Sequence, residues 1–258
     1  MRHGNLYMII DCVPADPKAP SGHKHNSRLS FELFAYGKSF IIDPGAYIYT
    51  ANKEMRNLFR STRYHNTVVV DGEEQNRFDE DKLFTIGCDA TVKVNRWVVT
   101  EKYDFLDAEH NGYARLKNPA IHRRQIYFYK EDGYWIIKDT LTGKGVHKFD
   151  LYFHFAPMKV GLLTMNRNVL MRIRRIKNQL IESEIKIDES FVIETKNNDG
   201  TNLLVIPLNV NDLSVEILDG WVSYSYGTKE KASIIKYSKV VNCPTEFLTL
   251  LYPVFLSE

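Results

Sequence analysis

The apolar runs of this chain are short, and this feature most constrains its fold. They are rich in Val, Ile, Tyr and Phe, and they end at Gly, Asn or Asp. Such runs predict β-strands separated by turns. We expect strands at 6–10, 29–36, 39–42, 67–70, 92–100, 125–129, 134–138, 149–155, 191–195, 203–206, 214–218, 221–226, 233–237 and 247–252. Hairpin turns are expected at Glu131-Asp132-Gly133, Asn198-Asp199-Gly200 and Asp219-Gly220.

Helical periodicity is scarce, and the best candidate is a short helix near 52–60. Many short strands with one short helix predict an all-β fold of stacked antiparallel sheets, a β-sandwich. We expect one domain over residues 1–258. A weak seam near Ala156-Pro157 separates a part with ligand-type residues, 1–155, from a further sheet, 156–258.

The charge balance excludes some classes of partner. Lys plus Arg total 34 and Asp plus Glu total 32, a net charge of +2 that argues against a nucleic-acid partner. No apolar run is long enough to span a membrane. The three cysteines show no disulfide or zinc-binding spacing. A basic run within 165–179 favours the solvated face of a hairpin. The alternative is one wall of a groove for an acidic polymer.

Three histidines and one aspartate lie at predicted strand ends. His23 and His25 alternate along an extended segment and so face the same side, Asp43 ends one strand, and His65 precedes another. Imidazole nitrogen and carboxylate oxygen are ligands that suit zinc. From spacing alone, locally hydrogen-bonded polar residues explain the pattern as well as a metal site does.

Three linked blocks surround these positions. They are Gly22-His23-x-His25-Asn26 with Leu29-Ser30-Phe31-Glu32-Leu33, then Gly37 to Tyr47 around Asp43-Pro44-Gly45, then Arg56-x-x-Phe59-Arg60-Ser61-Thr62-x-x-His65-Asn66-Thr67-Val68-x-Val70-Asp71-Gly72. In this order the blocks resemble a signature of the heparinase II/III family of polysaccharide lyases. The resemblance is strong to about residue 155 and general beyond it. It implies a C-terminal domain of stacked sheets, which in this family follows an N-terminal α/α toroid.

The resemblance also implies roles for the site residues. His25, Asp43 and His65 correspond to the zinc ligands, and His23 to a histidine that faces the substrate cleft and acts in catalysis. Family members cleave uronic-acid polysaccharides such as heparan sulfate or alginate by β-elimination. We predict Arg60, Arg63 and Asn66 as substrate-binding residues, because guanidinium groups bind acidic groups well. Ion pairing of the arginines within the domain is the alternative.

The toroid, with the family's catalytic tyrosine, is missing from this chain. We therefore expect a fragment of a longer enzyme or one product of a split gene, poorly active or inactive alone. The usual location of family members suggests that the protein is periplasmic or secreted in a bacterium. Two other functions stay open: a non-catalytic carbohydrate-binding domain with structural zinc, and a zinc hydrolase in which the metal activates water.

Overall fold

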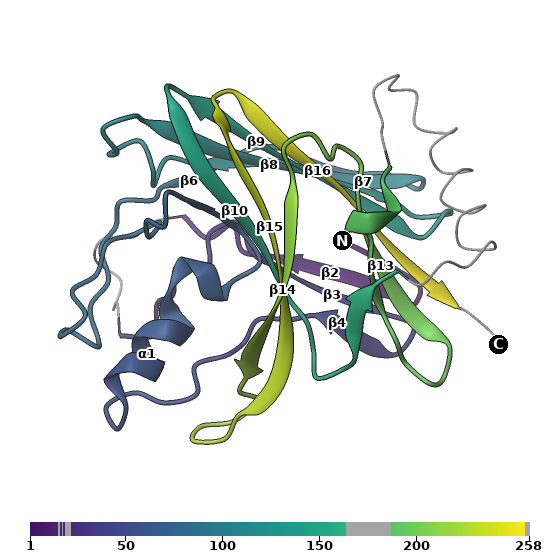
Figure 1. Cartoon of the computed structure of the whole chain (residues 1–258), viewed down its shortest axis with the longest axis horizontal. Helices are drawn as coiled ribbons and strands as arrows, with labels where there is room; N and C mark the ends of the chain where they lie inside the picture. The colour runs from purple at the N-terminus through teal and green to yellow at the C-terminus, as the bar shows by residue number, and fades with distance from the viewer. Residues whose placement is uncertain (15, 17, 19–21, 164–186, 256–258) are drawn as a thin grey trace.

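The computed structural model describes residues 1–14, 16, 18, 22–163 and 187–255 (Figure 1). Its strands are β1 (Arg2–His3), β2 (Leu6–Ile10), β3 (Phe31–Ala35), β4 (Lys38–Ile41), β5 (Val68–Val70), β6 (Val92–Val99), β7 (Tyr103–His110), β8 (Ala120–Tyr129), β9 (Tyr134–Gly143), β10 (Val146–His154), β11 (Val160–Leu162), β12 (Ile193–Thr195), β13 (Thr201–Pro207), β14 (Ser214–Val222), β15 (Glu230–Asn242) and β16 (Thr245–Phe255). The helical elements are α1 (Lys53–Arg60) and the single 3₁₀ turns η1 (Thr62–Tyr64) and η2 (Glu189–Phe191).

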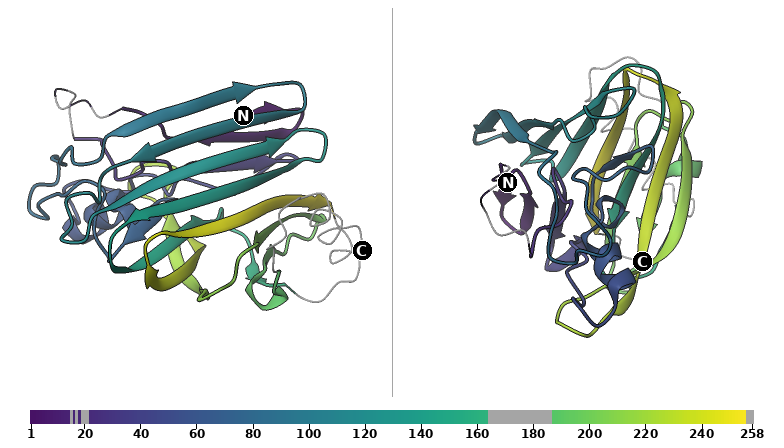
Figure 2. Two further views of the ribbon diagram at one scale, coloured as in Figure 1. Left: turned by 90° about the horizontal axis from the view of Figure 1, so that it is seen from above. Right: turned by 90° about the vertical axis from the view of Figure 1, so that its left-hand side faces the viewer.

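Three antiparallel sheets build the molecule. An eight-stranded sheet runs in the order β11-β12-β13-β16-β9-β8-β7-β6, and two four-stranded sheets run β1-β2-β3-β4 and β14-β15-β10-β5. Seen from above, the strands of the large sheet lie side by side in front of the N-terminal sheet (Figure 2). One apolar cluster takes fully buried side chains from all three sheets, among them Leu33, Phe128 and Phe153. The predicted stacked antiparallel sheets are therefore confirmed.

The predicted helix is present as α1. Asn52 caps it, with its side-chain oxygen accepting a hydrogen bond from the Met55 N–H, which satisfies one of the free N–H groups at a helix start. The hairpin turns at Gly133 and Gly200 are also present, and both glycines have positive φ. In the described residues no helix is long and apolar enough to cross a membrane.

The turn predicted at Asp219-Gly220 is wrong, because β14 runs unbroken from Ser214 to Val222. Gly220 serves packing instead: a Cβ atom there would come within 2.4 Å of Ile234 Cδ1 on β15. A glycine inside a strand often marks such a close approach.

The sequence pattern does not predict strand β7, because three of its eight residues are acidic. Two of these acids are buried against cations of β8 and the turn that follows it: Asp104 pairs with Lys130 and Asp107 with Arg123. Tertiary ion pairs thus allow a strand that composition alone disfavours. The basic run within 165–179 lies outside the described residues.

Candidate metal centre and its surroundings

His25, Asp43 and His65 come together from three separate segments. His25 lies on the loop before β3, Asp43 follows β4, and His65 follows η1. One ligand atom from each lies within 4.8 Å of the other two. Asp43 and His25 are half-buried, whereas His65 is fully buried. The grouping expected from the sequence is therefore present, and it could hold a metal ion.

Asn66 and Glu74 fix these segments against one another. The Asn66 amide donates to the carbonyls of Phe31 and Ile42, and its oxygen accepts from the His154 N–H. Because Ile42 precedes Asp43, Asn66 sets His65 beside that carboxylate.

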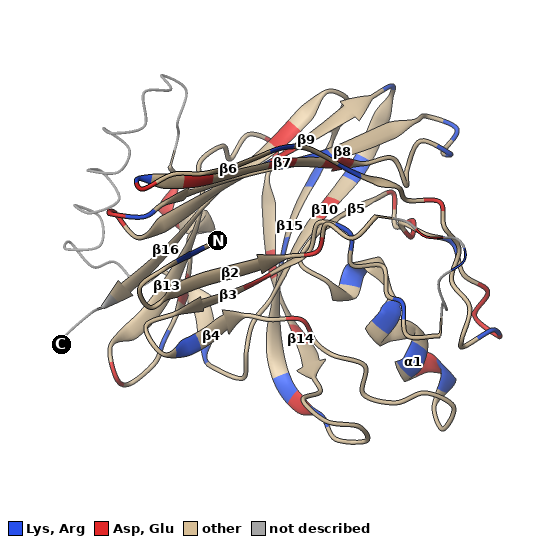
Figure 3. Ribbon diagram, turned by 180° about the vertical axis from the view of Figure 1, so that it is seen from behind, with Lys and Arg blue, Asp and Glu red and all other residues tan. Residues whose placement is uncertain are grey.

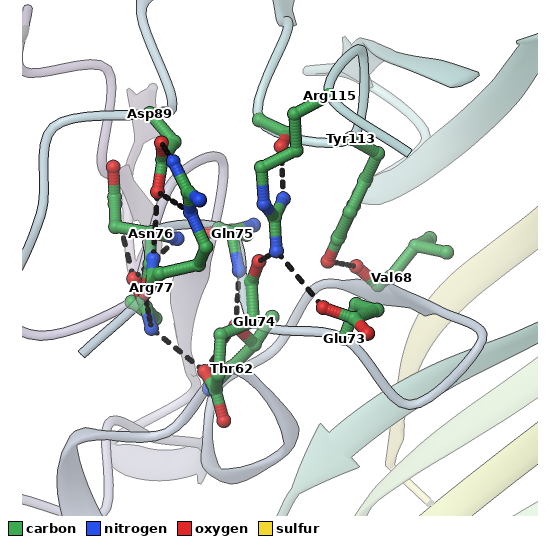
Figure 4. A network of polar contacts seen from close by, with 12 residues as sticks. Thr62, Val68, Glu73, Glu74, Gln75, Asn76, Arg77, Asp89, Tyr113 and Arg115 are labelled. Atoms are coloured by element: carbon green, nitrogen blue, oxygen red, sulfur yellow. Dashed lines mark hydrogen bonds and ion pairs between the residues drawn. The ribbon is translucent and has the colours of Figure 1, made fainter. Parts of the chain in front are cut away.

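The Glu74 carboxylate performs a similar task on the other side. It accepts hydrogen bonds from the Asn26 amide and from both the N–H and the hydroxyl of Thr62, each at 2.7 Å. Asn26 adjoins His25, and Thr62 begins the turn that precedes His65. Further contacts hold this 73–77 segment, including the Arg115–Glu73 ion pair (Figure 4). Glu74 is a positioning residue that no motif of the sequence marks.

Two of the donor spacings match those of a tetrahedral zinc site. His65 Nε2 lies 3.3 Å from His25 Nδ1 and 3.4 Å from Asp43 Oδ2. Two ligands of a tetrahedral zinc, with bonds of about 2.0–2.1 Å, lie about 3.3–3.4 Å apart. His65 Nδ1 is 2.8 Å from the Ser61 carbonyl oxygen, to which it donates. The proton of His65 is thereby placed on Nδ1, and the Nε2 lone pair faces the other two ligands.

The surroundings keep His25 neutral, as a metal ligand must be. Burial lowers the pKa of His25 well below its usual range, and the charges of His65, Arg56 and Arg60 lower it further.

One contact works against metal binding through Nδ1. Arg56 Nη1 lies 3.2 Å from His25 Nε2 and can only donate. This places the His25 proton on Nδ1, so a metal there requires Arg56 to give up the contact.

His23 lies on the exposed side of the same loop. Its Nδ1 atom is 3.0 Å from the Tyr49 hydroxyl, and the two rings meet edge to face with centroids 5.5 Å apart. The Tyr49 ring in turn lies 4.9 Å from the Arg56 guanidinium. A chain of contacts thus joins His23 to the metal group through Tyr49 and Arg56.

The three predicted substrate-binding residues lie in different environments. Arg63 is exposed on η1, two residues before His65. Arg60 is buried, and its guanidinium donates to the carbonyls of Asp79, Lys82, Leu83 and Thr85. Asn66 is also fully buried. Their substrate binding stays a prediction, and the contacts favour Arg63 over the other two.

Comparison with known proteins identifies the family. Residues 1–249 match the model of the family described as heparinase II/III-like, C-terminal. The chain belongs to this family. The heparin-sulfate lyases of Pedobacter heparinus and Bacteroides stercoris are 23% and 24% identical to it, over 90% and 94% of the chain. These alignments cover 30% and 31% of the two relatives, so the chain spans about a third of their length.

Solved structures show the same fold. The heparan sulfate lyase HepC of Pedobacter heparinus superposes with a TM-score of 0.74 at 20% identity, covering 98% of this chain and 34% of HepC. A structure of heparinase III superposes with a TM-score of 0.69 at 16% identity, covering 97% of this chain and 34% of that one. At these identities the likeness establishes the fold, and the chemistry must be argued from the site.

Proposed function

We propose that this chain is the zinc-bearing β domain of a polysaccharide lyase that cleaves uronic-acid polysaccharides by β-elimination. The observation that carries the proposal is the His25, Asp43 and His65 group beside an exposed His23, in a chain of the heparinase II/III family. The two heparin-sulfate lyases that resemble it favour a glycosaminoglycan as substrate.

β-Elimination sets three tasks at the cleaved bond. The uronate carboxylate must be neutralised, the C5 proton must be removed, and the leaving O4 must receive a proton as the C4–C5 double bond forms. Zinc held by His25, Asp43 and His65 would supply positive charge and bind the three segments together as a rigid wall. The exposed Arg63 guanidinium can hold acidic groups of the sugar.

The contact with Tyr49 sets the role that His23 can take. If the Tyr49 hydroxyl donates to Nδ1, the neutral ring carries its proton on Nε2 and can donate a hydrogen bond to a sugar oxygen. If Nδ1–H donates to Tyr49, Nε2 is a free base. A tyrosine on the helical domain of the family would perform the other transfer, so we propose that this chain acts together with such a domain.

Zinc content per chain, measured by elemental analysis, tests the metal centre. We expect about one zinc in the wild type and its loss in His25→Ala, Asp43→Asn and His65→Ala. Asp71→Asn is the matched control, because Asp71 pairs with His147 at 2.6 Å outside this group, and it should keep the metal. A folded wild type that binds no zinc overturns the centre.

The type of product tests the reaction class. Heparan sulfate treated with this chain and the helical domain should give unsaturated uronate, detected by its ultraviolet absorbance. New reducing ends without unsaturation would identify a hydrolase, and binding without cleavage would identify a carbohydrate-binding domain.

We also propose a periplasmic or secreted location, where a bacterium meets such polymers. Recovery of the protein only in the cytoplasmic fraction would contradict it.

A further inference from the structure

Three aromatic rings from three loops stack on one another, and the middle ring, Tyr49, contacts His23. The Tyr49 ring lies 5.9 Å from the Phe84 ring and 5.7 Å from the Tyr226 ring, with interplanar angles of 28° and 24°. Tyr226 is 63% exposed and Phe84 is 46% exposed. Offset stacking at this spacing is favourable, but exposing rings of this size has no benefit for folding. We call Tyr49, Phe84 and Tyr226 the aromatic platform.

Backbone contacts hold the Tyr226 loop rigidly against the loop that carries Tyr49. The Gly227 N–H donates to the Tyr47 carbonyl at 2.7 Å, and the Ser223 N–H donates to the Pro44 carbonyl at 2.8 Å. Gly45 permits this approach, since a Cβ atom there would lie 2.2 Å from the Ser223 oxygen.

The Phe84 loop is held equally well. Arg60 donates to several of its carbonyls, and the Arg56 Nε–H donates to the carbonyl of Leu83, next to Phe84. The platform is therefore pre-organised, and a ligand meets little ordering cost on binding to it.

The platform and the candidate catalytic residue share a wall. Tyr49 contacts His23 both through its hydroxyl and through its ring. A cation lies three residues from Tyr226 on the same loop: Lys229, whose Nζ atom is 4.0 Å from the Trp221 ring and 5.0 Å from the Tyr47 ring. Of the basic residues along α1 (Figure 3), Lys53 is exposed and pairs with Asp81, whereas Arg56 and Arg60 are buried.

We propose that the aromatic platform is a sugar-binding subsite that stacks one pyranose ring of a uronic-acid oligosaccharide, next to the sugar on which His23 acts in proton transfer. A pyranose presents an apolar C–H face with a polar rim, which matches a flat tyrosine surface that is rigid and amphipathic. The acidic groups of the rim would face the nearby cations. This subsite rests on the proposed function, which places an acidic polysaccharide against His23.

Binding of a size-defined heparan sulfate tetrasaccharide to the zinc-loaded chain, measured by titration calorimetry, tests the subsite. Removing a central aromatic contact should weaken binding, so Tyr226→Ala is expected to raise Kd about tenfold. Tyr226→Phe keeps the ring and should stay within about twofold of the wild type. Tyr224→Ala is the matched control, because Tyr224 is also 63% exposed but lies outside the stack.

The outcomes separate the subsite from the function on which it rests. If the wild type binds and Tyr226→Ala binds equally well, the platform is no subsite, while the proposed function stands. If Tyr224→Ala weakens binding as much as Tyr226→Ala, the stack has no special role, which also overturns the subsite. If the wild type does not bind the tetrasaccharide, the subsite is overturned, whereas the proposed function is still decided by the product that the chain forms together with the helical domain. Unchanged thermal unfolding of the variants confirms that each remains folded.

Discussion

Arg56 has a double role beside His25, and the two parts oppose each other. Its Nη2 group donates to the Gly22 carbonyl at 2.8 Å, which holds the loop that carries both His23 and His25. Its Nη1 group donates to His25 Nε2 and so directs the His25 proton toward the metal position. A buried guanidinium also repels a metal cation at this range. Arg56 therefore holds the loop in place, and at the proposed metal centre this would come at a cost in metal affinity.

Substitution of Arg56 should separate these two roles. We expect Arg56→Gln to raise zinc affinity about tenfold, because the charge is gone and the amide oxygen can accept the Nε2–H of a metal-bound His25. Arg56→Lys keeps the charge and should not raise the affinity. Competition with a chromophoric chelator measures both. Weaker zinc binding by a folded Arg56→Gln would mean that loop support outweighs repulsion.

Two glycines with positive φ in the loops near the site differ in what surrounds them. Gly45 has a φ of +83° and no room for a Cβ atom, whereas Gly72 has a φ of +74° and open space around it. Both positions therefore favour glycine for its backbone freedom, but only Gly45 lies against a second loop.

This difference predicts unequal effects of the same substitution. Gly72→Ala introduces backbone strain alone and should lower the free energy of unfolding by about 1–2 kcal/mol. Gly45→Ala adds a clash with the Ser223 carbonyl and should cost about 3 kcal/mol or more. Urea unfolding followed by fluorescence measures both values. Equal losses would show that the two loops separate easily.

Across the whole molecule, neutral buried histidines make stability depend on pH. Burial lowers the pKa of His154 from 6.5 to about 3, and His110 and His122 are lowered as well. Neither ring nitrogen of His110 is free to take up a second proton. Its Nδ1 atom accepts a hydrogen bond from the Gly112 N–H, and its Nε2 atom contacts His122 Nδ1. Between the folded and unfolded pKa values, the unfolded chain binds more protons, so stability is full above the unfolded pKa and decreases as pH falls.

We therefore expect the free energy of unfolding to fall as the pH is lowered from about 6.5 toward 4. His154→Gln should flatten this dependence, because glutamine can still donate to the Arg63 carbonyl that His154 Nε2 contacts at 3.1 Å but cannot take up a proton. Urea titrations at several pH values compare the slopes. A slope unchanged in His154→Gln would mean that His154 titrates alike in both states.

The amino-acid sequence by itself determined most of the strands, although not β7, and the capped helix, because local periodicity and turn chemistry act over a few residues. The strand expected at 221–226 is wrong beyond Val222, where β14 ends. The grouping of His25, Asp43 and His65 was predicted through the resemblance to a family signature, because spacing alone left a metal site and locally hydrogen-bonded residues equally open. Only the tertiary structure decided that Arg60 and Asn66 are buried among backbone carbonyls, that Gly220 lies within a strand, and that Tyr226 stacks on Tyr49. Burial and stacking depend on segments far apart in the chain, and no local pattern records which distant backbone will fill the space beside a side chain.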